Sequence, residues 1–211
     1  MKITIIYDNE VSEEGLEADW GFSCLVEVYG KKILFDTGAD GSILISNMKK
    51  LDIDPKVVEE VFISHSHWDH MGGLYDFLRI NKVRVYIPWS CQKPPGALEV
   101  IKVKEPIKIH ENIFSTGELQ NIEQSLVVKT EKGLVIIAGC SHPGVNNILK
   151  AASDFGNPDV LIGGLHGFSD FDLVEDLELI CPTHCTQFKS EIRSRYPKKY
   201  ISGGAGKIIE I

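Results

Sequence analysis

Short apolar runs alternate with segments of helical spacing along the whole chain. Strands are predicted where apolar residues recur at every second position or form brief unbroken runs, and helices where they recur every three to four positions. The predicted strands cover residues 2–7, 22–29, 32–35, 57–63, 83–87, 98–103, 107–110, 113–116, 126–129, 134–138, 159–162 and 207–211. The predicted helices cover residues 42–51, 74–80, 145–152, 171–179 and 187–195. This mixture predicts an α/β fold made of two α/β halves, and we expect one domain over residues 1–211.

A dense group of polar residues follows the apolar run at 57–63. Residues 64–73 read Ser-His-Ser-His-Trp-Asp-His-Met-Gly-Gly, so that four potential metal ligands fall within six positions: His65, His67, Asp69 and His70. Imidazole and carboxylate groups bind zinc, iron and manganese. The period of a strand would place the first three ligands on one side, and the two glycines permit the turn that His70 needs. The pattern predicts a metal site here.

Three later histidines also follow apolar β runs. His142, His166 and His184 each come just after a predicted strand or in a Gly/Pro turn. Ligands of α/β proteins gather beyond the carboxyl ends of strands, so we expect these histidines to join the first group, although each alone could be a structural histidine. His110 lacks this context and is interpreted as an ordinary strand or surface residue. Asp36 also ends a strand, and we expect it at most to support a ligand by a hydrogen bond.

Composition and charge argue against several classes of protein. A hydrophobic fraction of 43% and a charged fraction of 25% are ordinary for a globular domain. The net charge of −8 argues against a nucleic-acid partner, and no run has transmembrane length, so we expect a small-molecule substrate and no membrane. The N-terminal segment lacks the pattern of a signal peptide, which favours the cytoplasm. Five cysteines without a C-x2-C pair argue against a disulfide framework or zinc ribbon.

The motif at residues 65–70 has the form H-x-H-x-D-H, and it resembles the signature of the metallo-β-lactamase superfamily. Residues 36–38, Asp-Thr-Gly, resemble the upstream aspartate motif of that superfamily. Residues 117–118, 139–144, 163–166 and 182–186 resemble one branch of it. This branch contains 7,8-dihydropterin-6-methyl-4-(β-D-ribofuranosyl)aminobenzene 5′-phosphate synthases and uncharacterised metal-dependent hydrolases. The resemblance spans nearly the whole chain and implies a four-layer αβ/βα sandwich, the metallo-β-lactamase fold.

The resemblance also implies a dinuclear site for two divalent ions, zinc in the first place, with iron and manganese as alternatives. The implied ligands are His65, His67 and His142 for one ion, and Asp69, His70 and His184 for the other. Cys140 stands where much of the superfamily has a bridging aspartate, so it is either a thiolate ligand or a buried thiol. Aligning Cys140 with that position would put Glu118, and not His142, in the place of the third histidine. Both alternatives stay open.

Three functions are compatible with this resemblance. The first is a hydrolase in which two metals activate water against a small phosphorylated or ester substrate. In it, Asp69 would ligate and orient, and His166 would donate a proton or hydrogen bond to the substrate, or merely pack. The second is a transferase that condenses a dihydropterin diphosphate with an aminobenzene ribotide. The third is a non-catalytic metal-binding module. The sequence does not fix the oligomeric state.

Overall fold

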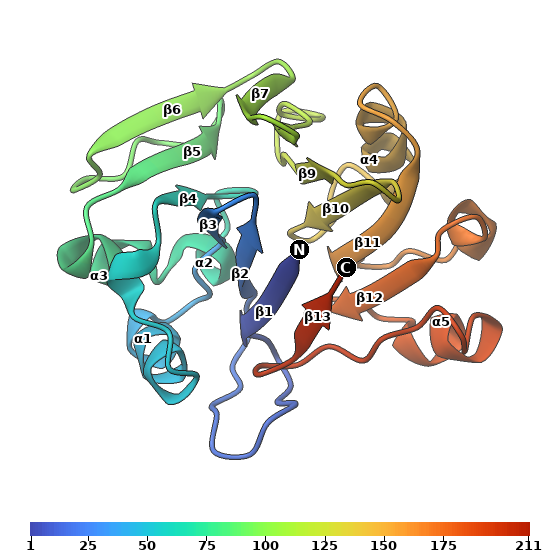
Figure 1. Ribbon diagram of the computed structural model, residues 1–211, viewed down its shortest axis with the longest axis horizontal. Coiled ribbons are helices and arrows are strands. Elements are labelled where there is room, and N and C mark those ends of the chain that lie inside the picture. Colours follow the sequence, from blue (N-terminus) through green and yellow to red (C-terminus); the bar gives the residue numbers. More distant parts are fainter. The chain divides into compact units, whose positions relative to one another are not determined.

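The computed structural model describes residues 1–211 and divides into two compact units. The first unit comprises Met1–Lys102 with Gly203–Ile211, and the second comprises Val103–Ser202. Each unit is built on one mixed β-sheet with helices packed against it (Figure 1). This arrangement confirms the expected α/β class, whereas the single domain over residues 1–211 stays a prediction. No helix is both long enough and apolar enough to cross a membrane.

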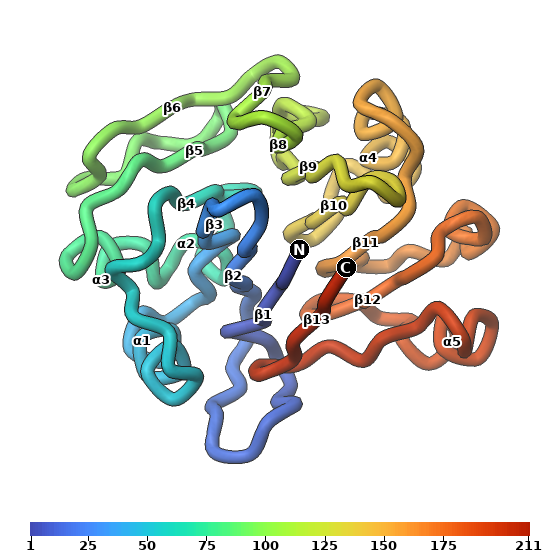
Figure 2. The backbone as a smooth tube through the Cα atoms, in the orientation of Figure 1, coloured from blue at the N-terminus to red at the C-terminus, as the bar shows by residue number.

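The sheet of the first unit has seven strands in the order β13-β1-β2-β3-β4-β5-β6. Its elements are β1 (Lys2–Tyr7), β2 (Ser23–Val28), β3 (Lys31–Phe35), α1 (Gly41–Lys50), η1 (Pro55–Val57), β4 (Glu60–Phe62), α2 (Trp68–Met71), α3 (Leu74–Ile80), β5 (Arg84–Pro88), β6 (Glu99–Val103) and β13 (Ile208–Glu210). Strands β3, β4 and β5 are parallel neighbours, so their carboxyl ends meet at one edge. Figure 2 shows the first and last strands, β1 and β13, side by side, and they pair antiparallel.

Helices α1 and α3 cover an apolar face of this sheet. Leu44 and Met48 of α1 and Phe77 of α3 are fully buried in one cluster with strand residues such as Leu34 and Val61. Helix α1 begins where the sequence predicts, because the Asp40 carboxylate accepts a hydrogen bond from the Ser42 amide at 2.7 Å. The apolar spacing of residues 42–51 therefore marks a real core face.

The sheet of the second unit has six strands in the order β12-β11-β10-β9-β8-β7. Its elements are β7 (Ile107–His110), β8 (Ile113–Ser115), β9 (Leu126–Lys129), β10 (Leu134–Ala138), α4 (Val145–Ala152), β11 (Pro158–Gly164), η2 (Phe171–Val174), β12 (Leu179–Thr183) and α5 (Lys189–Arg195). Strands β10, β11 and β12 are parallel neighbours, while β7 to β10 form an antiparallel meander. Val145 and Ile148 of α4 and Ile192 of α5 pack into the apolar cluster of this sheet.

Two predicted elements differ from the structure. The helix predicted over residues 171–179 is wrong: a single 3-10 turn, η2, is followed by an irregular segment and by the start of β12. Its apolar residues Val174 and Leu177 are buried, so their helical spacing reflects packing of a loop. The strand predicted over residues 57–63 is shorter, because Pro55 and Val57 form the turn η1 before β4 begins at Glu60.

Candidate metal centre

The carboxylate of Asp36 organises the candidate ligands of the first unit. Asp36 follows β3 and is fully buried, and its oxygens accept hydrogen bonds from the Ser64 amide, the Ser64 hydroxyl and His70 Nδ1, each at 2.7 Å. An ionised carboxylate only accepts, so His70 must carry its proton on Nδ1. The lone pair of His70 therefore lies on Nε2, the nitrogen left to bind a metal.

The same reasoning fixes the tautomer of His65. Ser64 has one hydroxyl hydrogen, and it is directed to Asp36. The 2.9 Å contact between Ser64 Oγ and His65 Nδ1 must then be donated by the histidine. His65 therefore also presents the lone pair of Nε2. One buried carboxylate thus orients two candidate ligands, a role that the sequence predicted for Asp36 only in general terms.

His67 lies next to the oriented nitrogen of His65. His65 Nε2 and His67 Nδ1 are 3.1 Å apart, and the two rings are roughly perpendicular, with centroids 4.5 Å apart. Two zinc–nitrogen bonds of about 2.0–2.1 Å span this separation at an angle of about 100°, near the tetrahedral value. The pair therefore fits a shared metal ion.

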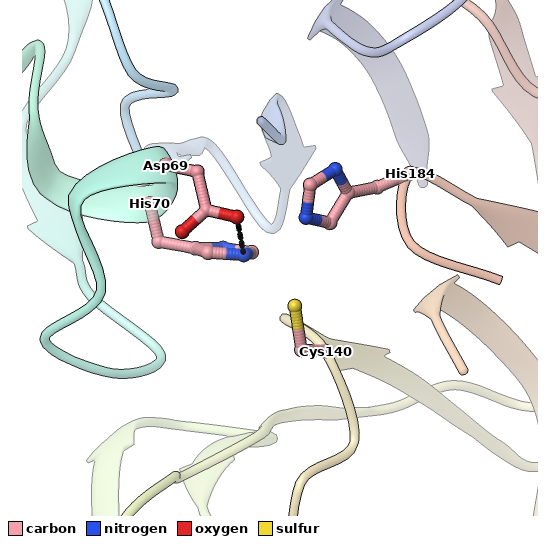
Figure 3. A group of neighbouring side chains, drawn as sticks. All are labelled: Asp69, His70, Cys140 and His184. Atoms are coloured by element: carbon pink, nitrogen blue, oxygen red, sulfur yellow. Dashed lines mark ion pairs between the residues drawn. The ribbon is translucent and has the colours of Figure 1, made fainter. Parts of the chain in front are cut away.

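Asp69 and His70 belong to a helix and not to an extension of the strand. Strand β4 ends at Phe62 and helix α2 begins at Trp68, so the strand period expected for residues 65–69 is not present. Figure 3 shows both side chains on α2, and its dashed line joins Asp69 Oδ2 and His70 Nε2, two potential metal-binding atoms that lie 3.8 Å apart. Gly72 and Gly73 are needed here for close approach and not for positive φ, since a Cβ on Gly72 would lie 2.1 Å from Ala39 O.

The segment before β2 donates two hydrogen bonds to Asp69. Trp20 Nε1 donates to Asp69 Oδ2 at 3.0 Å, and the Phe22 amide donates to the Asp69 carbonyl at 3.2 Å. Gly21 allows this approach, because a Cβ there would lie 2.6 Å from the same carbonyl. Trp20 is a contact that sequence reasoning missed, since no motif links it to the histidine group.

In the second unit, the candidate residues lie at the carboxyl ends of three neighbouring parallel strands. Cys140 and His142 follow β10, His166 follows β11 and His184 follows β12 (Cys140 and His184 are drawn in Figure 3). The rings of His142 and His166 have centroids 5.0 Å apart. A cavity of about 260 Å³ is lined by these two histidines, by Gly144 and Val145 at the start of α4, and by Leu165 and Phe168.

The turns that carry these residues have unusual backbone conformations. Asp36, Ser141, His166 and His184 all have positive φ, between 45° and 60°. Non-glycine residues rarely adopt this left-handed region, and they do so at a cost that functional sites tend to bear. Each of these residues directly follows one of the parallel strands β3, β10, β11 and β12 or lies within three residues of its end. Both units therefore direct side chains from strained turns at a strand edge.

Two cysteines of the second unit lie close to His166. The sulfur atoms of Cys140 and Cys185 and a ring nitrogen of His166 all lie within 4.8 Å of one another. A hydrogen bond with Cys140, the electrostatic effect of His184 and hydrogen bonds with His166 lower the pKa of the Cys185 thiol to about 5, against the opposing effect of burial. Cys185 was not among the residues predicted for the site.

Glu123 is a second buried carboxylate that the sequence did not single out. It is fully buried, and its two oxygens accept hydrogen bonds from the backbone amides of residues 139–142. Glu118, the alternative to His142 as a ligand, donates its amide to the Lys104 carbonyl at 3.0 Å in the connection between β8 and β9.

Comparison with known proteins identifies relatives across the whole chain. A family model described as the metallo-beta-lactamase superfamily matches residues 21–184. The 7,8-dihydropterin-6-methyl-4-(beta-D-ribofuranosyl)-aminobenzene-5′-phosphate synthase of Methanocaldococcus jannaschii is 28% identical, and the match covers 90% of this chain and 89% of the synthase. An uncharacterised protein of the same organism is 27% identical, and the match covers 99% of this chain and all (100%) of that protein.

Solved structures give a similar result. The crystal structure of a metal-dependent hydrolase of the β-lactamase superfamily is 28% identical, with a TM-score of 0.83 over 100% of this chain and 99% of the hydrolase. A metallo-β-lactamase fold protein of Bacillus subtilis is 12% identical, with a TM-score of 0.71 over 100% of this chain and 99% of that protein, and is similar in fold alone.

Proposed function

Because the chain belongs to the metallo-β-lactamase superfamily, we propose that it is a metal-dependent hydrolase that acts on a small phosphorylated or ester substrate. Membership and fold agree with the resemblance expected from the sequence. One observation carries the proposal. The Asp36 carboxylate fixes the tautomers of His65 and His70 so that both present a lone pair on Nε2. A structural histidine cluster would not need this arrangement, whereas a metal site does.

The proposed centre holds two divalent ions, zinc in the first place. The proposed ligands are His65, His67, Asp69, His70, His142 and His184, with Cys140 as a further thiolate candidate. The family match covers all of these positions. When bound, such ions lower the pKa of a water molecule and stabilise negative charge on an attacked phosphoryl or carbonyl group.

Two residues have roles beyond ligation in this proposal. Asp69 has one oxygen held by Trp20, which fixes the direction of the other oxygen. His166 borders the cavity beside His142, where its ring would donate a hydrogen bond or proton to the substrate. The cavity of about 260 Å³ beside these two histidines is where we propose that a small-molecule substrate binds.

A second candidate is a pterin-transferring synthase, and the similarity to the archaeal synthase over 90% of this chain favours it. In this reaction the ions would neutralise a diphosphate leaving group, and an amine would replace water as the nucleophile. The same ligands serve both candidates, so only the product distinguishes them.

Metal content tests the proposed centre. Protein purified without chelator should contain about two metal ions per chain by elemental analysis. The His67→Ala variant should lose metal, because the nitrogen that faces His65 is removed. His110→Ala, the same substitution on β7, is the matched control and should retain the full content. Full metal content in the His67→Ala variant would contradict the assignment.

Product analysis tests the reaction. The metal-loaded protein is incubated with a panel of phosphate esters and carboxyl esters, and separately with dihydropterin diphosphate and an aminobenzene ribotide. Release of alcohol or phosphate that is lost in the His67→Ala variant supports the hydrolase. Formation of the carbon–nitrogen product supports the synthase instead. A metal-loaded protein that is inert in every assay would favour a non-catalytic metal-binding module.

A further inference from the structure

Glu123 makes an unusual set of contacts with the turn that follows β10. Its Oε1 accepts hydrogen bonds from the amides of Gly139 at 3.0 Å, Cys140 at 3.1 Å and Ser141 at 3.0 Å. Its Oε2 accepts a fourth from the amide of His142 at 2.9 Å. Four consecutive backbone amides thus converge on one carboxylate. Such a concave run of amides is an anion-binding shape, and here the anion is a side chain of the same unit.

This arrangement determines the path of the turn. Ser141 has a φ of 60°, the left-handed conformation that turns successive amides toward one point. The Ser141 hydroxyl also donates to the Gly164 carbonyl at 2.7 Å, which ties the turn to the end of β11. The turn is therefore held at its backbone by Glu123 and at its centre by the neighbouring strand.

Because Glu123 is buried, its carboxylate and the four amides each depend on the other for hydrogen bonds. The side chain is fully buried, and a buried carboxylate without partners is strongly unfavourable. Four amide donors offset that cost, and in return the carboxylate satisfies four amides that could not all find carbonyl partners in a tight turn. Glutamine, the neutral side chain of the same shape, has only one acceptor oxygen and could not accept from all four amides. The second carboxylate oxygen is therefore needed to hold the turn.

Two of the four amides belong to Cys140 and His142. We propose that Glu123 is a positioning residue that sets the metal affinity of His142 and Cys140 by fixing the backbone from which they project. The inference rests on the proposed metal-dependent function. It is independent of which reaction the metals support, because it concerns only how the ligand turn is shaped.

The substitution Glu123→Gln tests this selectively. Glutamine has one acceptor oxygen, and placing it at the Oε1 position keeps three amides satisfied. The new amide group then faces the His142 amide, donor against donor, so the turn should open at His142. We expect the metal dissociation constant of the site that includes His142 to rise by about 10- to 100-fold, the usual range for loss of an orienting partner. Glu131→Gln, on the exposed β9–β10 turn, is the matched control and should bind as the unmodified protein does.

A double-mutant cycle separates positioning from a general effect on folding. Metal dissociation constants are measured by chelator competition for the unmodified protein, Glu123→Gln, His142→Ala and the double variant. If Glu123 acts through His142, Glu123→Gln should have less than about a twofold effect in the His142→Ala background. Independent effects that multiply would overturn the proposal, as would unchanged affinity in Glu123→Gln.

The design also distinguishes failure of the proposed function. If His142→Ala binds metal as the unmodified protein does, His142 is not a ligand, and the proposed role of His142 in the metal site is refuted. If His142→Ala is impaired and Glu123→Gln is not, only the positioning role is refuted. Should Glu123→Gln fail to fold, Glu123→Asp keeps the charge but is one methylene shorter, and we expect it to fold with weakened binding. Normal binding by that folded variant would count against the proposal.

Discussion

Asparagine at position 36 would change one atom of the network that orients His65 and His70. Asparagine tolerates the positive φ of 52° at this position, so the backbone should be preserved. Its oxygen can still accept from the Ser64 amide, and the Ser64 hydroxyl can turn to accept from the new amide group. The contact with His70 cannot be kept in its present form, because donor would face donor.

The size of the effect follows from that single contact. The ring of His70 either loses its acceptor or moves its proton to Nε2, where the proton occupies the nitrogen needed by a metal. Loss of a buried hydrogen bond to a charged group costs about 1.5–3 kcal/mol. Tenfold in affinity corresponds to about 1.4 kcal/mol, so metal binding should weaken by about 10- to 100-fold.

Competition with a chromophoric chelator measures this change in the purified Asp36→Asn variant. Asp40→Asn is the matched control, since Asp40 caps α1 through Ser42 and asparagine caps a helix equally well. Thermal unfolding of the metal-free proteins shows whether both variants are folded. A folded Asp36→Asn variant with the metal affinity of the unmodified protein would refute the tautomer argument.

Three further outcomes are expected. Trp20→Phe removes the hydrogen bond to Asp69 from a half-exposed indole and should weaken metal binding about fivefold, while Trp89→Phe should not; equal affinity of both variants would contradict this role. Gly72→Ala places a Cβ against the Ala39 carbonyl and should lower the free energy of unfolding by about 1–3 kcal/mol in chemical denaturation, whereas Gly167→Ala, which has room, should change it little. In metal-free protein, the ultraviolet absorbance of the Cys185 thiolate should appear as the pH is raised through about 5, because the lowered pKa keeps this thiol ionised at any higher pH. The Cys185→Ser variant should lack this step, and a step near pH 9 instead would disprove the prediction.

Local patterns in the sequence predicted most of the elements that carry the candidate site. The spacing within residues 65–70 marks the candidate ligands because they are close in sequence, and the apolar runs before His142 and His166 correctly predict strands β10 and β11, whereas strand β12 before His184 was not predicted. The predicted helix at 171–179 failed because buried apolar residues in a loop imitate helical spacing.

Contacts between side chains and distant backbone could not be predicted in this way. Glu123 binds amides 16 to 19 positions away, and Trp20 binds a carboxylate 49 positions away. Neither contact produces a repeating pattern in the sequence. Any residue type can supply the backbone amides that Glu123 binds, and the Trp20 contact is a single pair of residues far apart in the chain. The start of α2 at Trp68 was missed for a related reason: its four residues are too few to show helical spacing.

At the strand ends, the residues with positive φ lower the stability of the fold while carrying side chains of the proposed site. Glycine adopts positive φ without the penalty that a side chain brings, so at His166 and His184 a glycine would relieve strain of about 1 kcal/mol or more. Selection for thermal stability alone should therefore drive these two positions toward glycine and remove two histidines of the proposed site. Laboratory evolution toward heat resistance would need a parallel activity screen, because without one it would enrich stable variants in which these two histidines are replaced.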